Sequence, residues 1–229
     1  MGRGAGGGRK PSFLNRLPER DKTRLMSLGS RQRLRPREPV LAVGKAGVDV
    51  VVLEQGHVKV TSTDHEARQV ILDVGGPGDI YGEAAVMTRL PRMADVVALD
   101  DVALRRIDAE TFRRFLHENP ETTYQISVLQ SERLWNAQRE RTNTRTPDMT
   151  VQIARRLLYL VDVCASERDG GWSVDAPLTQ EEQAAFIPVS RGTLAKALKQ
   201  LRSQNVIATG RRSLTVIDVP RLQSLAEMT

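Results

Sequence analysis

Short apolar runs of β character occupy residues 38–108 and are separated by turn-forming residues. Glycine, proline and aspartate mark the turns, most densely at residues 75–78 and 100–101. Many short strands at this spacing favour a β-barrel or jelly roll over a parallel sheet. The runs predicted to be strands are Val48–Leu53, His57–Thr61, Gln69–Val74, Asp79–Tyr81, Asp95–Leu99 and Ala103–Ile107.

On both sides of this region the apolar residues recur with a helical period. Residues 12–30 are predicted to form short helices. Asp108 can cap a short helix through Leu116, because an aspartate side chain accepts hydrogen bonds from the first free backbone N–H groups of a helix. Asn119-Pro120 then opens a long helix to about Thr146, where a proline follows and is expected to end it.

The segment 178–202 predicts two short helices joined by a tight turn. Thr179 can cap the first helix and Ser190 the second. In the second helix the apolar residues recur every three or four positions and are expected to face inward, while basic residues fall on the other side. A helix of this kind suits the major groove of DNA. An ordinary helical hairpin with a solvated basic face is the plainer alternative.

Two β-prone runs follow this helix pair, Val206–Thr209 and Ser213–Ile217, and they flank a Gly-Arg-Arg turn. This pattern predicts a β-hairpin. Helices followed by a small hairpin make a winged helix-turn-helix. Arg211 and Arg212 at the tip of the hairpin are placed to meet DNA phosphates.

The charge of the chain is unevenly distributed. Its 229 residues carry a formal net charge of +6. Residues 1–37 hold eleven basic and two acidic residues, whereas residues 179–229 hold seven and four. The basic surplus therefore lies mainly at the N-terminus and does not by itself point to the helix pair. The glycine-rich residues 1–11 are predicted to be a flexible tail.

The residue types that carry most covalent and metal chemistry are scarce. A single cysteine, Cys164, excludes an internal disulfide or a four-cysteine metal site within one chain, and its apolar surroundings predict a buried thiol. His57, His65 and His117 have no metal-ligand spacing and are expected at the surface. No catalytic arrangement or phosphate-binding loop stands out, so no enzyme is predicted. No apolar run approaches membrane-spanning length and no signal-peptide segment is seen, which predicts a cytoplasmic protein without membrane contact.

The order of these parts, a β-roll, a long helix and a winged helix-turn-helix, resembles the CRP/FNR family of bacterial transcription regulators over about residues 12–220. The matching residues are Gly56, Gly78-Asp79, Gly82-Glu83, Arg92-Met93-Ala94, Asp148, Ile153-Ala154, the Leu-Thr-Gln-Glu-Glu run at 178–182, and Ser190, Arg191 and Thr193. The resemblance implies an α+β fold. The expected parts are a tail at 1–11, a β-roll effector domain at 12–119, a dimerisation helix at 120–147 and a DNA-binding domain at 148–229.

The resemblance also implies an effector pocket in the roll. In cyclic-nucleotide-binding members, the residues matched by Gly82 and Glu83 meet the ligand and its ribose, and the arginine matched by Arg92 neutralises the cyclic phosphate. Residues of the long helix complete the pocket. The candidate effector-binding residues are Gly82, Glu83, Ala84, Arg92, Met93, Ala94, Arg133, Ala137 and Gln138.

This pocket departs from the cyclic AMP pattern at two contacts. Met93 stands where a hydroxyl residue is expected to bind the phosphate, and Ala137-Gln138 stands where a Thr-Ser pair reaches the adenine. Each lost contact costs about 1–3 kcal/mol, so cyclic AMP is not expected to bind tightly. Another cyclic nucleotide, a cyclic dinucleotide such as cyclic di-GMP, or no effector at all stays open. In a purely architectural alternative, Glu83 and Arg92 pair with each other.

The long helix is expected to form a homodimer by parallel packing along a two-fold axis, as the resemblance implies. Its N-terminal half offers apolar side chains, whereas its C-terminal half is polar. Such a seam is a poor coiled coil and is either switchable or simply frayed. The candidate dimer residues are Ile126, Leu129, Leu134, Ala137 and Arg141.

At the DNA-binding end, the resemblance implies that Arg191 contacts a guanine and that Lys196 reads a second base. Gly192 stands where the family often has a glutamate, and Pro188 replaces the usual turn glycine, so base preference and turn geometry are expected to differ. The candidate DNA-binding residues are Thr179, Ser190, Arg191, Gly192, Thr193, Lys196, Lys199, Arg211 and Arg212.

The sequence therefore predicts a homodimeric, sequence-specific regulator that binds double-stranded DNA, with RNA polymerase as a further candidate partner. One alternative is a ligand-independent architectural DNA binder, which predicts weak sequence preference. Another is a cyclic-nucleotide-binding regulatory subunit that acts on a protein, which would leave the basic helix face unused.

Overall fold

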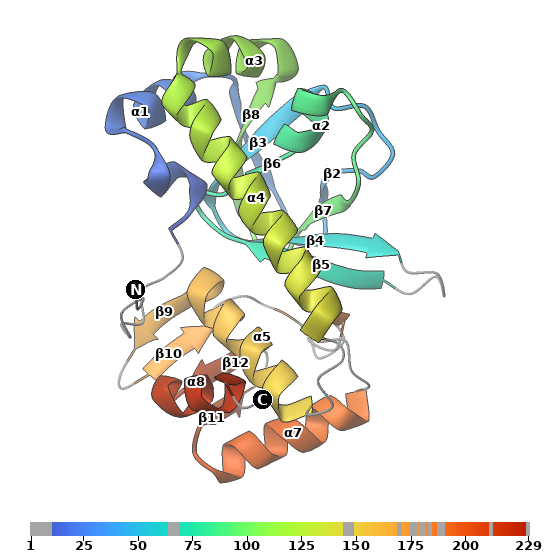
Figure 1. The fold of residues 1–229 in the computed structure, drawn as a ribbon, viewed down its shortest axis with the longest axis vertical. Coiled ribbons are helices and arrows are strands. Elements are labelled where there is room, and N and C mark those ends of the chain that lie inside the picture. Colours follow the sequence, from blue (N-terminus) through green and yellow to red (C-terminus); the bar gives the residue numbers. More distant parts are fainter. Residues whose placement is uncertain are drawn as a thin grey trace. The chain divides into compact units, whose positions relative to one another are not determined.

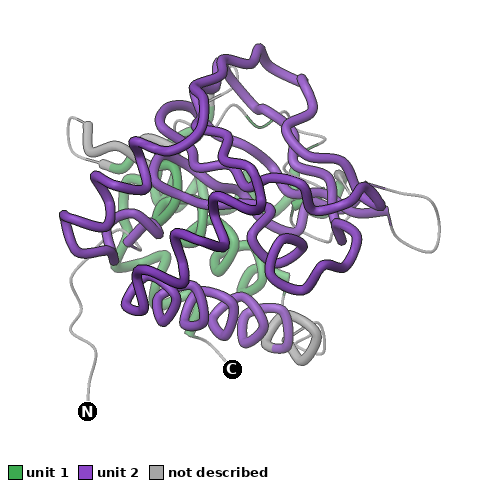
Figure 2. Tube along the Cα trace, turned by 90° about the horizontal axis from the view of Figure 1, so that it is seen from above, with its two compact units in different colours: residues 1–10, 145–229 green, residues 11–144 purple. Residues whose placement is uncertain are grey.

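A computed structural model describes residues 11–63, 69–143, 149–168, 171–174, 178, 182, 185–186, 191–210 and 213–227. They divide into two compact units (Figure 2). Pro11–Thr144 forms one unit, and the described part of residues 145–229 belongs to the other. Each unit has its own strands and its own core.

The N-terminal unit is built on two antiparallel sheets, which confirms the predicted roll (Figure 1). The first sheet has the order β1 (Ser30–Leu34), β8 (Val102–Asp108), β3 (Asp49–Gln55), β6 (Ile80–Tyr81). The second has the order β2 (Pro39–Leu41), β7 (Asp95–Ala98), β4 (Val58–Thr63), β5 (Gln69–Gly75).

Strand β3 explains how the sheets and helices are layered. Because successive side chains of a strand point to opposite faces, its apolar run is buried on both sides. Val51 and Leu53 pack in the core that both sheets share. Val50 and Val52 pack on the other face, in a core shared with the helices. The helices of this unit are η1 (Phe13–Arg16), α1 (Glu19–Ser27), α2 (Glu83–Thr88), α3 (Ala109–Glu118) and α4 (Pro120–Asn143).

Helices α3 and α4 begin where the sequence predicts. The Asp108 carboxylate accepts hydrogen bonds from the backbone N–H groups of Glu110 and Thr111, at 3.1 and 2.9 Å, and so caps α3. These bonds lower the pKa of Asp108 below its ordinary value. Pro120 occupies the first turn of α4, where a missing N–H costs nothing.

Three elements of the roll were not predicted. Strand β1 carries the polar sequence Ser-Arg-Gln-Arg-Leu and is exposed at several positions, as an edge strand can be. Strand β2 is only three residues long. Helix α2 follows Gly82, whose φ of 90° is a left-handed conformation that glycine adopts without strain.

The C-terminal unit combines helices with a small antiparallel sheet of order β11-β12-β10-β9. The pair β11 (Ile207–Gly210) and β12 (Ser213–Val216) confirms the predicted hairpin, and β10 (Gly171–Val174) pairs with β12 in the same sheet. Strand β9 (Ala165–Arg168) and helix α8 (Val219–Glu227) were not predicted.

Helices α5 (Met149–Cys164) and α7 (Arg191–Ser203) supply most of the described core of this unit. Cys164 is buried, as expected, and is not part of a disulfide. Among the described residues, no helix is long and apolar enough to cross a membrane, and no group of histidine, cysteine and carboxylate side chains could hold a metal ion.

Candidate effector pocket and DNA-binding surface

A cluster of three charged side chains, Asp49, Arg92 and Arg106, forms where β3 begins. Asp49 begins β3, and Arg106 lies on β8 on the same face as the core residue Leu104, two positions away. Arg106 donates to the Asp49 carboxylate Oδ2. Arg92, from the loop between α2 and β7, donates from Nη2 to the other carboxylate oxygen and to the Asp49 backbone oxygen, the latter at 2.9 Å. The Asp49 carboxylate therefore forms salt bridges with two guanidinium groups.

The backbone of Arg92 is fixed by the loop that precedes β3. Its N–H donates to the Lys45 carbonyl at 2.9 Å, and its carbonyl accepts from the Gly44 N–H at 2.8 Å. The side chain is then only 5% exposed. Burial lowers the pKa of Arg92, and the nearby Asp49 carboxylate opposes that shift.

One terminal nitrogen of this buried guanidinium, Nη1 of Arg92, has no hydrogen-bond partner. It packs against Gly82, where an added Cβ would lie 2.5 Å from Nη1. Gly82 therefore makes room for the guanidinium. A buried N–H group without a partner is costly and marks a place where an acceptor could be accommodated.

A second charged cluster joins α2 to α4. Glu83, in the first turn of α2, is 2% exposed and accepts from Arg133 Nη1 at 2.5 Å and from the Gln130 side-chain amide. Arg133 also donates to the Ile80 carbonyl at 3.0 Å and lies 5.1 Å from the centre of the Tyr81 ring. Burial acts to lower the pKa of Arg133, but the combined attraction of Glu83, Tyr81, Asp73 and Asp79 outweighs it and holds that pKa above its ordinary value.

These contacts overturn the expectation that Glu83 and Arg92 pair with each other in an architectural roll. Arg92 instead binds Asp49, and Glu83 binds Arg133 and Gln130. The candidate effector residues thus fall into two neighbouring sets, one around each carboxylate.

The remaining candidate effector residues lie on α2, on the loop that follows it and on α4. Ala84 and Ala94 are half-buried, and Met93 is 79% exposed. Ala137 and Gln138 are exposed, one turn of α4 beyond Arg133. The structure therefore brings together Gly82, Glu83, Arg92 and Arg133, and leaves Met93 at the surface.

Sequence reasoning missed Asp49, Arg106 and Gln130. Two of them carried a signal, since Asp49 and Arg106 interrupt or border apolar runs predicted to be strands, where a charge needs a partner. Gln130 gave none, because a glutamine on a long helix is ordinary. The expectation for His57 was also wrong, because its ring Nδ1 lies 2.8 Å from Asp100 Oδ2 and its side chain is only 14% exposed.

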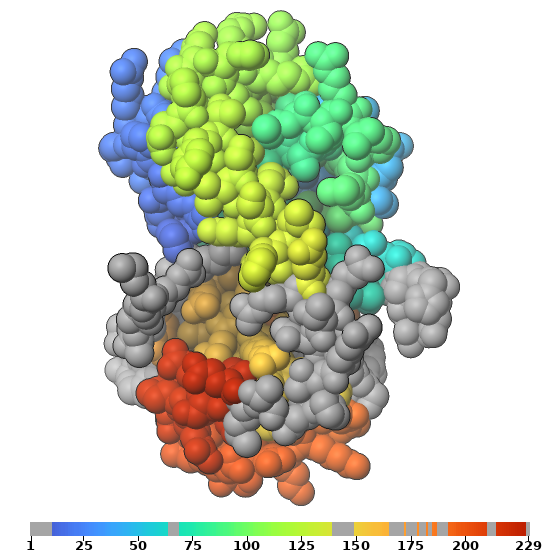
Figure 3. Space-filling view, in the orientation of Figure 1, coloured from blue at the N-terminus to red at the C-terminus, as the bar shows by residue number. Residues whose placement is uncertain are grey.

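The predicted dimer residues differ in burial along α4. Ile126 and Leu129 are buried in the core of their own chain, so their assignment to the dimer seam is wrong. Leu134 is 60% exposed, and Ala137 is exposed beside it. The side chain of Arg141 lies outside the described residues. Figure 3 shows α4 as a continuous yellow-green band on the surface of this unit.

A different stripe of α4 is exposed in its place. Tyr124 is 62% and Trp135 65% exposed, and Ser127 and Ser131 between them are exposed as well. With Leu134, these positions recur every three or four residues and share one helix face.

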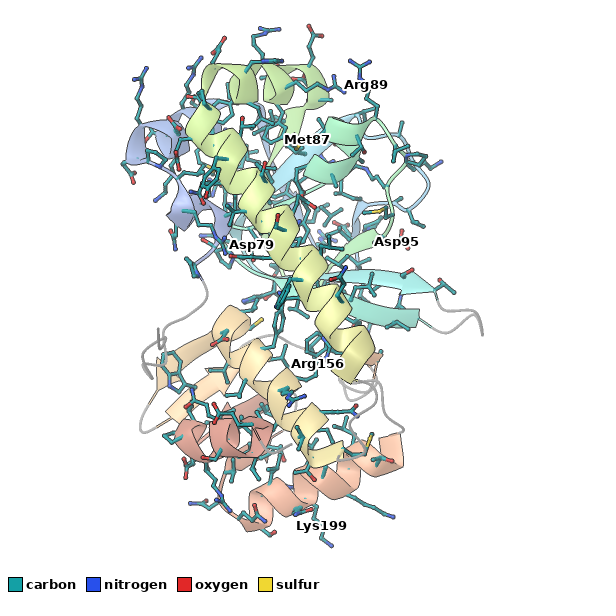
Figure 4. All side chains as sticks on the ribbon, in the orientation of Figure 1. Asp79, Met87, Arg89, Asp95, Arg156 and Lys199 are labelled. Atoms are coloured by element: carbon teal, nitrogen blue, oxygen red, sulfur yellow. The ribbon has the colours of Figure 1, made fainter. Side chains whose placement is uncertain are left out.

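Helix α7 separates an apolar face from a polar one, as predicted. Its buried residues are Leu194, Ala197 and Leu201. Gly192, Lys196 and Lys199 are exposed, and Thr193 is half-buried. In Figure 4 the Lys199 side chain points away from the ribbon of this unit.

The other candidate DNA-binding positions are less fully defined. Arg191 is the first residue of α7, and its side chain is not described. Thr179, Pro188, Ser190, Arg211 and Arg212 lie outside the described residues. The structure therefore describes this candidate surface mainly through the exposed and buried residues of α7.

Two family models match the chain. A model of the cyclic nucleotide-binding domain matches residues 31–119. A model of the Crp-like helix-turn-helix domain matches residues 151–225. The two matches fall on the roll and on the unit that contains α7.

Curated relatives match most of the length of the chain. A CRP-like cAMP-activated global transcriptional regulator of Mycobacterium tuberculosis is 26% identical over 183 residues, which cover 80% of this chain and 82% of the relative. A cyclic AMP receptor protein of Thermus thermophilus is 25% identical over 199 residues, which cover 85% and 88%.

Solved structures share the fold. FixK2 from Bradyrhizobium japonicum superposes with a TM-score of 0.77 at 16% identity, covering 88% of this chain and 99% of that one. The c-di-GMP-responsive regulator CLP from Xanthomonas campestris superposes with a TM-score of 0.72 at 20% identity, covering 88% and 100%.

Proposed function

The chain belongs to the CRP/FNR family of transcription regulators and is a DNA-binding regulator rather than an enzyme, and from that premise we propose that it acts as a homodimer on a two-fold-symmetric DNA sequence. The observation that carries the proposal is the division of α7 into two faces. Leu194, Ala197 and Leu201 anchor the helix in its unit, while Lys196 and Lys199 are left exposed. A cationic helix face anchored in this way fits the major groove of duplex DNA.

We expect the dimer to form through the exposed stripe of α4, namely Tyr124, Ser127, Ser131, Leu134 and Trp135. The opposite face of α4 is occupied by its own roll, through Ile126, Leu129 and Arg133. Large exposed apolar side chains at helical spacing are the usual material of a helix–helix seam. The two-fold axis would then place two α7 helices on half-sites one helical turn apart.

The effector pocket is proposed to reject cyclic AMP as a tight ligand. Met93 is exposed and offers no hydroxyl, and both central charges, Glu83 and Arg92, already have carboxylate or cationic partners inside the chain. No effector, or a cyclic dinucleotide that places no phosphate at Arg92, is compatible with these features. Function in the cytoplasm, and contact with RNA polymerase, follow from the proposed role as a regulator.

Selection of genomic fragments by the purified chain, followed by gel-shift assays, tests the DNA-binding proposal. Arg191→Ala is expected to remove the preference for selected over random fragments, because a guanine contact carries about 1–3 kcal/mol of discrimination. Arg212→Ala is expected to weaken binding to both kinds of fragment equally, since a phosphate contact carries no sequence information. Equal loss on both kinds of fragment for Arg191→Ala would contradict the proposed base contact.

The second candidate function, a ligand-independent DNA binder, is favoured by the internally paired charges of the pocket. Thermal-shift screening against cyclic mono- and dinucleotides separates the two. A ligand that raises the unfolding midpoint and also changes the affinity for a selected fragment identifies an effector. The absence of any such ligand favours the ligand-independent binder.

A further inference from the structure

The Arg92–Asp49–Arg106 cluster holds more positive than negative charge, and its two arginines are unequally satisfied. Arg106 donates to the Gln32 side chain at 2.9 Å and to the Val40 carbonyl at 3.0 Å, besides Asp49. Among the described residues, the Arg92 side chain binds only Asp49, and its buried Nη1 has no partner. Asp49 is therefore the one carboxylate among the described residues that both guanidinium groups contact.

We propose that Asp49 is a specificity-determining residue, a resident carboxylate that takes the place of a ligand's anionic group at Arg92. The pocket is thereby biased against ligands that carry a phosphate at this position and towards uncharged ones. The inference rests on the proposed use of this pocket for an effector, but it does not depend on DNA binding.

Asp49 cannot easily leave this position. Its backbone is paired in the ladder between β3 and β8, with Asp49 opposite Asp108. Its second carboxylate oxygen is held by Arg106, and Arg106 is anchored to Gln32 and Val40 as described above. A phosphate that reached Nη1 would therefore meet a fixed negative charge on the same guanidinium, and like charges at such separations repel strongly away from bulk water.

The space beside Arg92 also limits rearrangement of the guanidinium. Gly82 already touches Nη1, so closely that a Cβ at this position would lie 2.5 Å away. Removal of the Asp49 charge, with the shape of the side chain kept, would leave two buried guanidinium groups without a carboxylate. A phosphate is the natural replacement, because it accepts several charge-assisted hydrogen bonds from arginine.

The test compares the wild-type chain with Asp49→Asn, with inorganic phosphate as the probe and chloride at matched ionic strength as the reference. The wild type is expected to show no phosphate-specific rise in its unfolding midpoint. Asp49→Asn is expected to gain about 3 °C or more when phosphate stands at ten times its dissociation constant. The double variant Asp49→Asn/Arg92→Gln is expected to lose that gain, and Asp101→Asn, which removes a carboxylate at an exposed position, is expected to behave as wild type.

A second measurement uses only the wild-type chain and so does not depend on the folding of a variant. Titration with adenosine and with cyclic AMP is expected to give affinities within about threefold of each other, because repulsion from the Asp49 carboxylate offsets what the phosphate would gain at Arg92 Nη1. A tenfold preference for cyclic AMP, a phosphate-specific midpoint shift in the wild type, or the lack of one in folded Asp49→Asn would overturn the inference. Failure of the proposed function would be seen separately, as a wild-type chain that selects no DNA.

Discussion

The charged clusters of the roll and the exposed face of α7 both gather charge, but the charges are compensated in opposite ways. In the roll, Asp49 and Glu83 are each bound by two side chains of the same chain. On α7, Lys196 and Lys199 stand exposed on a helix anchored by its apolar face. Buried charges must be compensated within the fold, whereas exposed ones can be kept for a partner. In the proposed function, the exposed face of α7 is therefore available to DNA, whereas the charges of the proposed effector site are already paired within the chain.

The largest expected effect lies in the pocket. Glu83→Ala removes the carboxylate from Arg133 and Gln130, and it is expected to lower the free energy of unfolding of the roll by about 3 kcal/mol. Chemical denaturation followed by circular dichroism measures this loss. Glu121→Ala, which removes an exposed glutamate near the start of α4, is the matched control and is expected to cost less than about 0.5 kcal/mol. Equal losses of unfolding free energy in the two variants would show that the contacts of Glu83 stabilise the roll no more than an exposed glutamate does.

The exposed stripe of α4 gives the next effect in size. Leu134→Glu is expected to convert the dimer to a monomer and to weaken binding to a two-fold-symmetric fragment more than tenfold, because charges are costly in an apolar seam. Analytical ultracentrifugation and gel shifts report the two effects. Leu90→Glu is a close control, since Leu90 is 63% exposed against 60% for Leu134 but lies outside α4. If the Leu134→Glu variant remained dimeric, the dimer seam would have to lie on another surface of the chain.

A smaller effect is expected at the start of α3. Asp108→Ala is expected to cost about 1 kcal/mol, because the helix loses its capping carboxylate, whereas asparagine keeps an acceptor and most of the stability. The folded-state pKa of Asp108 lies below its ordinary value, so its contribution is complete above about pH 4 and is lost as the pH falls through the folded pKa. The difference in the free energy of unfolding between wild type and Asp108→Asn is therefore expected to shrink as the pH falls from neutral to acidic. Denaturation curves of both proteins at the two pH values measure this difference. Divergence towards low pH would contradict the assigned cap.

The smallest effect concerns single charges on α7. Lys199→Ala is expected to weaken binding to selected and random fragments alike by a few-fold and to reduce the salt dependence by about one counterion, as a phosphate contact does. Gel shifts over a range of salt concentrations measure the slope. An unchanged slope would remove Lys199 from the DNA-binding surface.

The sequence predicted those parts of the fold whose pattern is local. The uninterrupted valine run of β3 and the Gly-Arg-Arg signal of the β11–β12 turn needed no distant information. Strand β1 escaped prediction because its arginines and its glutamine look like a loop, and only pairing with β8 makes it a strand. Helix α2 is six residues long and too short to show a period.

The sequence predicted the motif residues of the proposed effector site but not the contacts that they make. The motif residues Gly82, Glu83 and Arg92 could be named, whereas Asp49 lies 43 positions from Arg92 and nothing local links the two. The seam of α4 failed for another reason. Apolar residues occur on both faces of that helix, and periodicity alone could not say that Ile126 faces the roll and Leu134 does not.

The central claim is that α7 reads DNA twice in one symmetric dimer. Sedimentation of the full-length chain with a selected, two-fold-symmetric genomic fragment tests it most directly. The account predicts two chains per fragment, with Arg191→Ala showing no preference for this fragment over random DNA. One chain per fragment, or full retention of sequence preference in Arg191→Ala, would contradict it.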